Sequence, residues 1–516
     1  MSSSHSESHT GTHTLGRLTE ESWQRFDDYE SLFFEGTWYR SHQLAQRARR
    51  VTGGFRELGV RPGDRVAVMM ANCPEVPITY WALWRAGAVV TPVVFLVSAD
   101  ELRHILTDSG ARAIVTTPEV LLTVQLATDG LDISIVVVGD GPEQTIPYAQ
   151  LESCEEAPLV DSADDDIAAL MYTGGTTGRA KGVMLTNAGL YHTSRSARQA
   201  TEVHGLNRTL VPLPLSHAYG LIVTLSGMQS SEPGKAVLMR WFEPKEWERL
   251  AAEHRVHVSS LVPAMIHMLL ANPEFGSTPL PDLRYVTSGA APLARETLEE
   301  FERRLPGVEI LEGYGLTETS AVTSVNPPGR RKVGSVGLPL PGYTVTIRDE
   351  DGKDLPSGED GEICVRSASL MRGYRHEPDT ATTAIVDGEL RTGDIGHVDE
   401  DGYIYVVDRK KDLIIRGGFN VFPRDVEDAL TEHPEVTMAG VVGRRDPKSG
   451  EEIVAFVSLA ADATVTPDEL IAWTRERIGK IKYPREVHVV ESVPVTSVFK
   501  TDRKRLRQLL AEQTGQ

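Results

Sequence analysis

A run of eleven residues, 172–182, concentrates groups that bind phosphate. It reads YTGGTTGRAKG and holds four glycines, three threonines and one lysine. Glycines let several backbone N–H groups turn toward one point, while the threonines add hydroxyls and Lys181 adds a positive charge. The spacing is not that of the common P-loop, because Ala180 and Gly182 stand where glycine and Ser/Thr are required. The run is predicted to cradle a polyphosphate in another way, although a flexible surface loop fits the same composition.

Two further loops of small and polar residues belong to a predicted β–α–β unit at residues 283–318. The unit consists of a strand at 284–288, a turn at 289–291, a helix opened by Pro292, and a strand at 308–311 that leads into GYGLTE. Both loops follow the carboxyl ends of strands, where open α/β sheets bind their ligands. We therefore expect them to border a ligand site.

Composition limits the class of protein. A chain of 516 residues exceeds one hydrophobic core, so at least two domains are expected. The net charge of −20 argues against a nucleic-acid or anionic-membrane surface. Three cysteines without a C-x-x-C pair fit a reducing cytoplasm and no structural metal site. No apolar run is long enough to span a bilayer, so a cytoplasmic protein is predicted.

The order of patterns along the chain predicts the fold class. Residues 1–14 are rich in Ser, His and Thr and are expected to form a disordered tail. Strand-like and helical segments then alternate to about residue 330, which is typical of α/β layers built on parallel sheets. Short strands and turns at about 331–409 indicate a small β-rich subdomain. After the charged DRKKD link at 408–412, a separate α+β domain is expected.

Five motifs in fixed order resemble the acyl-adenylate-forming (AMP-binding) superfamily. They are TGGTTGRAKG at 173–182, GYGLTE at 313–318, RTGD at 391–394, DRKKDLIIRGGFNVFP at 408–423, and Lys500. This superfamily includes acyl-CoA synthetases, adenylation domains of peptide synthetases and beetle luciferases, and the chain is most similar to fatty acyl-CoA ligases. The resemblance implies a large N-terminal domain at 15–409, a hinge at 410–411 and a small mobile lid domain at 412–516.

The resemblance also implies the reaction. A carboxylate attacks the α-phosphorus of ATP, pyrophosphate leaves, and the thiol of coenzyme A attacks the acyl-AMP. The implied cofactors are ATP, Mg²⁺ and coenzyme A, and the catalytic residues are Lys500, Glu318 and Thr173. Glu318 and Thr173 would hold the metal, and Lys500 would bridge the substrate carboxylate and the α-phosphate.

Further site residues are implied by matching motifs. Tyr314 would stack on adenine, and Asp394 would accept hydrogen bonds from the ribose, aided by Arg409. A turn about Lys411 would bring Gly417 and Gly418 over the site to line a tunnel for the thiol arm. The residues implied to bind the nucleotide are Thr173, Gly174, Gly175, Thr176, Thr177, Gly178, Lys181, Gly313, Tyr314, Gly315, Thr317, Asp394, Arg409 and Lys500.

The acyl pocket is expected to hold a fatty or bulky apolar acid. The segment at 214–220 lacks the aspartate with which amino-acid-activating relatives pair an amine. Its His217 fits a pocket wall, or a histidine packed in a loop. Small residues leave room for the acyl group. The residues assigned to the pocket are His217, Ser288, Gly289 and Ala290.

Three positions depart from the family pattern and leave alternatives open. Gly174 replaces a serine, Ala180 a proline, and Phe499 the glycine before Lys500, which puts the reach of that lysine in question.

One alternative function is an acyl-AMP ligase that loads a carrier protein in a natural-product pathway. Another is a nucleotide-binding protein that has lost catalysis. The expected partners are the acid, ATP and coenzyme A, with a carrier protein and a homodimer left open.

Overall fold

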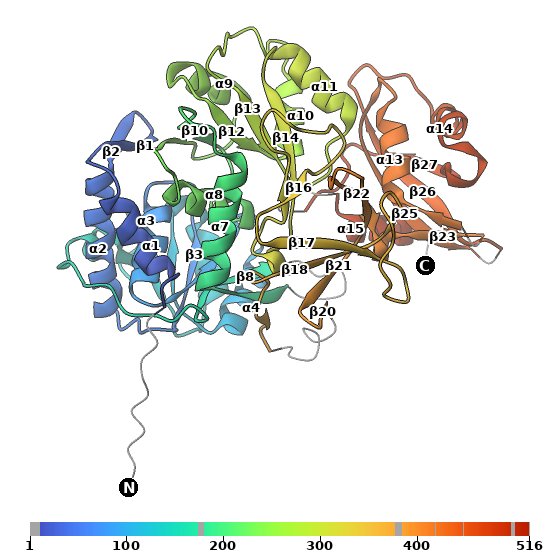
Figure 1. The fold of residues 1–516 in the computed structure, drawn as a ribbon. Coiled ribbons are helices and arrows are strands. Elements are labelled where there is room, and N and C mark those ends of the chain that lie inside the picture. Colours follow the sequence, from blue (N-terminus) through green and yellow to red (C-terminus); the bar gives the residue numbers. More distant parts are fainter. Residues whose placement is uncertain are drawn as a thin grey trace.

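The computed structural model describes residues 11–173, 180–376, 384–417, 419–446, 448–496 and 501–514. A mainly parallel sheet comes first, with the order β19-β9-β8-β4-β3-β5-β6-β7 (Figure 1). Alternate residues of β3 face two cores: Val66 and Val68 pack with α1, α2 and α3, and Ala67 and Met69 pack with α4 and α5. Both faces of this sheet are therefore covered, as predicted. The elements are α1 (Leu15–Gln24), α2 (Ser41–Glu57), β3 (Arg65–Met69), α3 (Glu75–Arg85), β4 (Val89–Pro92), α4 (Ala99–Ser109), β5 (Ala111–Thr116), η1 (Pro118–Val120), α5 (Leu121–Thr128), β6 (Ser134–Val137), β7 (Ile146–Pro147), α6 (Tyr148–Glu152), β8 (Ile167–Thr173), β9 (Lys181–Thr186) and β19 (Gly373–Tyr374).

A second sheet has the order β16-β15-β14-β13-β12-β10-β11-β1-β2, and its central strands are parallel. Its core holds Trp247, Ile266 and Phe301 from three different helices. The β–α–β unit predicted at 283–318 is present as β13, α11 and β14. The elements are β1 (Glu30–Phe34), β2 (Thr37–Arg40), α7 (Asn187–Thr201), β10 (Arg208–Val211), α8 (Ala218–Met228), β11 (Lys235–Leu238), α9 (Pro244–Glu253), β12 (Val258–Leu261), α10 (Pro263–Ala271), β13 (Tyr285–Ser288), α11 (Arg295–Arg304), β14 (Glu309–Tyr314), η2 (Thr317–Thr319), β15 (Ser324–Val325) and β16 (Leu338–Pro339).

The remaining strands form two smaller sheets. An antiparallel sheet holds β17 (Tyr343–Arg348), β18 (Gly361–Ser367), β20 (Ile385–Val386), β21 (Glu389–Val398) and β22 (Ile404–Arg409). The C-terminal sheet has helices against both faces, since Leu430 and Leu470 belong to one core and Leu506 to another. Figure 1 shows this unit beside β21 and β22. Its elements are η3 (Lys410–Asp412), β23 (Ile414–Arg416), β24 (Phe419–Val421), α13 (Pro423–Thr431), β25 (Val436–Asp446), β26 (Gly450–Leu459), α14 (Pro467–Lys482), β27 (Glu486–Val489) and α15 (Arg503–Thr514).

The predicted α/β class, with a large N-terminal part and a small C-terminal domain, is confirmed, but local predictions need correction. The disordered tail is wrong for residues 11–14, because Thr14 caps α1 and the His13 N–H donates to Asp164 Oδ1 at 2.7 Å; residues 1–10 lie outside the described part. Helix α11 starts at Arg295, not at Pro292, because the backbone of Ala294 is still extended, with φ −66° and ψ 143°. Within the described ranges, no helix has the length and apolarity needed to cross a bilayer.

Candidate active site

A cleft of about 2940 Å³ lies where the two large sheets, the β-rich sheet and the C-terminal domain meet. Most of the predicted site residues line it. Seven other predicted site residues lie outside the described residues: Gly174, Gly175, Thr176, Thr177, Gly178, Gly418 and Lys500. Those that line the cleft are Thr173, Lys181, His217, Ser288, Gly289, Ala290, Gly313, Tyr314, Gly315, Thr317, Glu318, Asp394, Arg409 and Lys411.

Gly417 is the exception among the described predicted residues, because it does not line the cleft. It follows β23 in the turn that leads to β24, with φ +58°, and its N–H donates to the Ser449 carbonyl at 2.6 Å. The left-handed backbone explains why glycine suits this position. In this arrangement of the C-terminal domain, the glycine turn is thus separate from the cleft.

A fixed negative charge lies at the end of β14. Asp394 on β21 is only 3% exposed, and its cross-strand partner is Arg409 on β22. The Tyr314 hydroxyl donates to Asp394 Oδ2 at 2.6 Å, and Arg409 Nε lies 3.0 Å from Asp394 Oδ1. Burial and then the charge of Asp394 raise the pKa of Tyr314 well above its ordinary value, so this hydroxyl remains a donor. Each carboxylate oxygen keeps a lone pair for a further donor, such as a sugar hydroxyl.

A second cluster of polar side chains surrounds the two ends of the glycine-rich loop. Thr173 and Lys181 are directly opposed residues at the ends of β8 and β9, so the loop between them begins and ends at the cleft. Glu318 on η2 accepts a hydrogen bond at 2.8 Å from the hydroxyl of Tyr374. The Lys181 ammonium lies 5.4 Å from the centre of the Tyr374 ring. These contacts place one carboxylate, one hydroxyl and one ammonium around the same part of the cleft.

This donor set fits Mg²⁺. Among the described residues, no group of three or more His, Cys, Asp or Glu side chains could hold a metal ion by itself. Mg²⁺ commonly binds through one or two carboxylates together with substrate phosphates and retains water molecules. The Glu318 carboxylate and the Thr173 hydroxyl have the chemistry of such ligands, with the other ligands supplied by a nucleotide and water.

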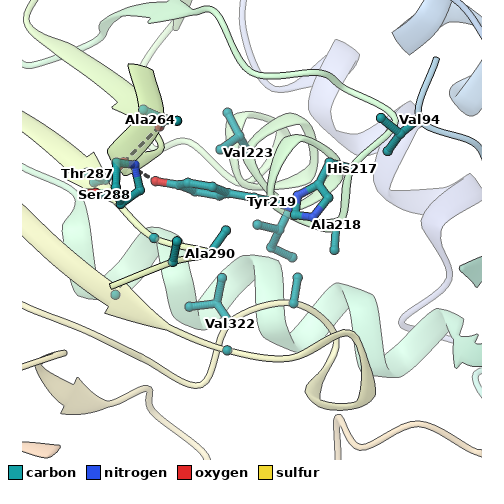
Figure 2. A pocket seen from close by; sticks show the side chains of 18 of the residues that line it. Val94, His217, Ala218, Tyr219, Val223, Ala264, Thr287, Ser288, Ala290 and Val322 are labelled. Carbon is teal, nitrogen blue, oxygen red and sulfur yellow. Dashed lines mark hydrogen bonds between the residues drawn. The ribbon is translucent and has the colours of Figure 1, made fainter. Parts of the chain in front are cut away.

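A largely apolar pocket opens from the cleft toward α8 and α10. Figure 2 shows Val94, Ala218, Val223, Ala264 and Val322 among its lining side chains. His217 is the N-cap of α8, where its Nδ1 accepts from the Tyr219 N–H at 3.2 Å. His217 is therefore both a helix cap and part of the pocket wall.

One chain of hydroxyls interrupts this apolar wall. Tyr219 donates to Thr287 Oγ1 at 2.7 Å, and Thr287 donates to Ser260 Oγ at 2.9 Å. The sequence motifs do not assign Tyr219, Thr287, Ser260 or Tyr374 to the site. Of these four residues, only Tyr219 could have been found from the sequence, because it stands two residues after His217 in the segment at 214–220.

We expect Ala290→Gly to stabilise the protein. Ala290 has φ +70°, in the left-handed region that costs a residue with a Cβ atom about 1–2 kcal/mol. Glycine avoids this cost. Its greater conformational freedom in the unfolded chain, however, lowers the free energy of unfolding by about 0.4–1 kcal/mol. The net gain of roughly 0.5–1 kcal/mol should raise the midpoint of thermal unfolding. The control Ala291→Gly should lower it, since Ala291 lacks a positive φ; an equal decrease in both variants would contradict the argument.

The pH dependence of stability should change in Glu312→Gln. Burial raises the pKa of Glu312 from 4.5 to about 7, although Arg424 and Arg331 oppose the shift. A raised pKa means that the folded protein holds the proton more tightly, so this stabilisation is present below pH 4.5 and lost as the pH rises through about 7.

At pH 8 the Glu312→Gln variant should therefore exceed the wild type in free energy of unfolding by about 1–3 kcal/mol, and at pH 4 it should not. Denaturant titrations of both proteins at the two pH values measure this difference. The exposed Glu359→Gln is the control. A difference between wild type and Glu312→Gln that is the same at both pH values would show that Glu312 does not titrate in this way.

Comparison with known proteins identifies the family. Residues 19–375 match the family described as AMP-binding enzyme, and residues 425–500 match the AMP-binding enzyme C-terminal domain. A feruloyl-CoA synthase of Amycolatopsis sp is 34% identical over 477 residues, which cover 92% of this chain and 94% of that protein. A long-chain-fatty-acid–CoA ligase of Bacillus subtilis is 32% identical over 530 residues, with 96% and 94% coverage.

A solved structure supports the same assignment. ATP-bound MatB from Rhodopseudomonas palustris superposes with a TM-score of 0.87 and 29% identity, over 96% of this chain and 99% of that one. The resemblance drawn from the five motifs is thus confirmed at the level of the family. The chain belongs to the AMP-binding enzymes and is an AMP-forming acid–CoA ligase.

Proposed function

We propose that this enzyme converts a fatty or bulky apolar carboxylic acid and ATP into acyl-AMP and pyrophosphate, and then transfers the acyl group to coenzyme A. One observation carries the proposal: a single cleft joins the apolar pocket at Tyr219 to the anionic corner at Asp394 and to the mouth of the loop at Thr173. An acid, a ribose and a polyphosphate can therefore meet in one space.

The anionic corner is proposed to bind the nucleoside. Asp394 accepts hydrogen bonds from the ribose hydroxyls, and Arg409 holds the carboxylate in place. Tyr314 presents its ring to adenine while its hydroxyl stays bonded to Asp394. Because both Tyr314 and Arg409 fix the carboxylate before ATP arrives, little ordering is left to occur on binding.

The triphosphate is proposed to lie against Thr173, Lys181 and the loop residues 174–178. Mg²⁺ held by Glu318 and Thr173 would neutralise phosphate charge. The Tyr374 hydroxyl orients Glu318, and Lys181 adds a second positive charge beside it. Lys500 is proposed to contact the acid and the α-phosphate. Neither half-reaction requires a nucleophile from the protein, so these residues act by position and charge.

The acyl group is proposed to occupy the pocket between Tyr219 and Ala290. A Cβ atom on Gly289 would lie 3.3 Å from the Gly313 carbonyl oxygen and 3.8 Å from the Tyr219 ring, so the backbone itself forms this wall. The small residues Ser288, Gly289 and Ala290 leave width for a bulky or long chain. The two relatives described above act on acids that both carry a large apolar part, which supports the same class here.

Coenzyme A is proposed as the acceptor, reached after the C-terminal domain turns about Lys411. That turn would bring Gly417 and Gly418 to the cleft. The separate position of Gly417 in the present arrangement supports this proposal, because the glycine turn must move to reach the cleft. In each of its two positions the C-terminal domain would cover the cleft, first for acyl-AMP formation and then for transfer to coenzyme A. This would keep water from the acyl-AMP.

The proposal is tested by incubating the enzyme with ATP, Mg²⁺ and a panel of carboxylic acids. Mass spectrometry should detect acyl-AMP, and pyrophosphate release should depend on both ATP and the acid. Addition of coenzyme A, compared with a phosphopantetheinylated carrier protein, then identifies the acceptor. If the acyl group is transferred to the carrier protein in preference to coenzyme A, the carrier protein replaces coenzyme A as the acceptor. ATP binding without acid-dependent pyrophosphate release would indicate a protein that has lost catalysis.

A further inference from the structure

Four charged side chains connect the hinge to the start of the last helix. Arg503 is the first residue of α15, and its Nη2 donates to both carboxylate oxygens of Glu427 on α13, at 2.9 and 2.7 Å. Its Nη1 lies 3.6 Å from Asp412 Oδ2 in the hinge turn η3. Arg507, one turn farther along α15, donates to Asp412 Oδ1 at 2.8 Å. We call Asp412, Glu427, Arg503 and Arg507 the hinge ion cluster.

The hinge ion cluster is shielded from water at its centre. The exposed fractions of the side chains are 7% for Asp412, 14% for Glu427 and 18% for Arg503. Glu427 Oε1 also accepts from the Val441 N–H of β25 at 2.8 Å, which joins an edge strand of the C-terminal sheet to the same ions. Charged hydrogen bonds in such a setting are strong, and removing one partner leaves the other uncompensated.

Arg503 is the charge that makes this arrangement possible. Burial raises the pKa of Glu427 to about 7, and Arg503 contributes the largest opposing effect. Burial also raises the pKa of Asp408 near the end of β22, and the charge of Arg503 is the largest effect that opposes this rise. A single guanidinium therefore serves three carboxylates, and its planar fork can hold one of them through two hydrogen bonds.

The cluster adjoins the segment that carries Lys500. Residues on either side of this segment are bonded to each other: Val495 and Thr501 form an antiparallel bridge, and the Asp502 N–H donates to the Pro494 carbonyl at 2.8 Å. Both ends of the segment 496–500 are thus joined immediately before Arg503. Lys500 itself is outside the described residues, so the inference concerns its flanks.

We infer that Arg503 is a positioning residue for adenylation. Through Glu427 and Asp412 it fixes residues 501 and 502, which follow Lys500 in the sequence, to the hinge turn η3 and to α13. Rotation of the domain about Lys411 would then carry these flanking residues as part of one rigid body. This inference depends on the proposed role of Lys500. It assigns Arg503 no contact with substrate.

The test separates the two half-reactions in the full-length enzyme. Arg503→Lys keeps the positive charge but loses the fork, so acid-dependent pyrophosphate release should fall about tenfold or more at saturating ATP. Formation of acyl-CoA from supplied acyl-AMP should change less than about twofold, since that step does not use Lys500. The exposed Arg505→Lys on the same helix is the matched control and should leave both rates unchanged. Glu427→Gln, which keeps the shape of the side chain, should reproduce the selective loss.

The outcomes distinguish this inference from the proposed function. Unchanged adenylation in Arg503→Lys, or an equal loss of both half-reactions, would overturn the positioning role. If Arg503→Lys does not fold, Glu427→Gln decides by the same criterion. Lys500→Ala measured in parallel reports on the proposed function: if Lys500→Ala loses adenylation while Arg503→Lys and Glu427→Gln retain it, only the present inference fails.

Discussion

Replacing Lys500 with alanine is expected to slow acyl-AMP formation about 1000-fold, the upper range for the loss of one donor that stabilises charge in a transition state. The attacking carboxylate and the α-phosphate repel each other, and the repulsion is greatest as the new bond forms. An ammonium between them acts mainly at that stage, so the KM for ATP should change little. Acid-dependent pyrophosphate release at saturating ATP measures the effect.

The second half-reaction provides the control for Lys500→Ala. Acyl-CoA formation from supplied acyl-AMP should persist, because the acid is already activated when the thiol attacks. Arg505→Ala, an exposed cation a few residues away, should retain both activities. Full adenylation in Lys500→Ala would remove Lys500 from the mechanism.

The sequence predicts elements well where the local pattern decides the structure. Apolar residues at helical spacing over residues 41–58, followed by Gly59, predict a helix that stops before this glycine, and α2 ends at Glu57 with Gly59 at φ +79°. The β–α–β unit at 283–318 was likewise predicted from its alternating segments. Pro292 misled the prediction of a helix start because proline is favoured both at a first helical turn and in extended chain. Here the cleft-lining turn at Ala290 extends the loop to Ala294.

Contacts between distant residues could not be read from the sequence. Tyr374 reaches Glu318 across 56 positions, and Tyr219 reaches Thr287 across 68. No spacing rule joins such pairs, because sheet order brings them together: β19 pairs with β9 next to the glycine-rich loop. Motifs identified Glu318 and Asp394 themselves, while the hydroxyls that orient them depend on the tertiary structure.

Asp394→Asn is expected to lower kcat/KM for ATP about 100-fold, which corresponds to about 3 kcal/mol. Asp394 uses one oxygen for Tyr314 and the other for Arg409, and it is almost fully buried. Asparagine has the same shape but only one acceptor oxygen, so its amide N–H₂ must face a donor. Loss of one partner in a buried charged pair commonly costs about 3–5 kcal/mol.

The loss in Asp394→Asn should fall on nucleotide binding, which distinguishes it from the loss in Lys500→Ala. Calorimetric titration with ATP should show weaker binding, whereas pyrophosphate release at saturating ATP should fall less. Tyr314→Phe removes one of the two contacts and should cost roughly tenfold, as expected for one charged hydrogen bond. Asp401→Asn, on the exposed turn between β21 and β22, is the matched control and should bind ATP normally. Normal ATP affinity in Asp394→Asn would place the ribose elsewhere, and the cleft would then have to bind ATP in another orientation.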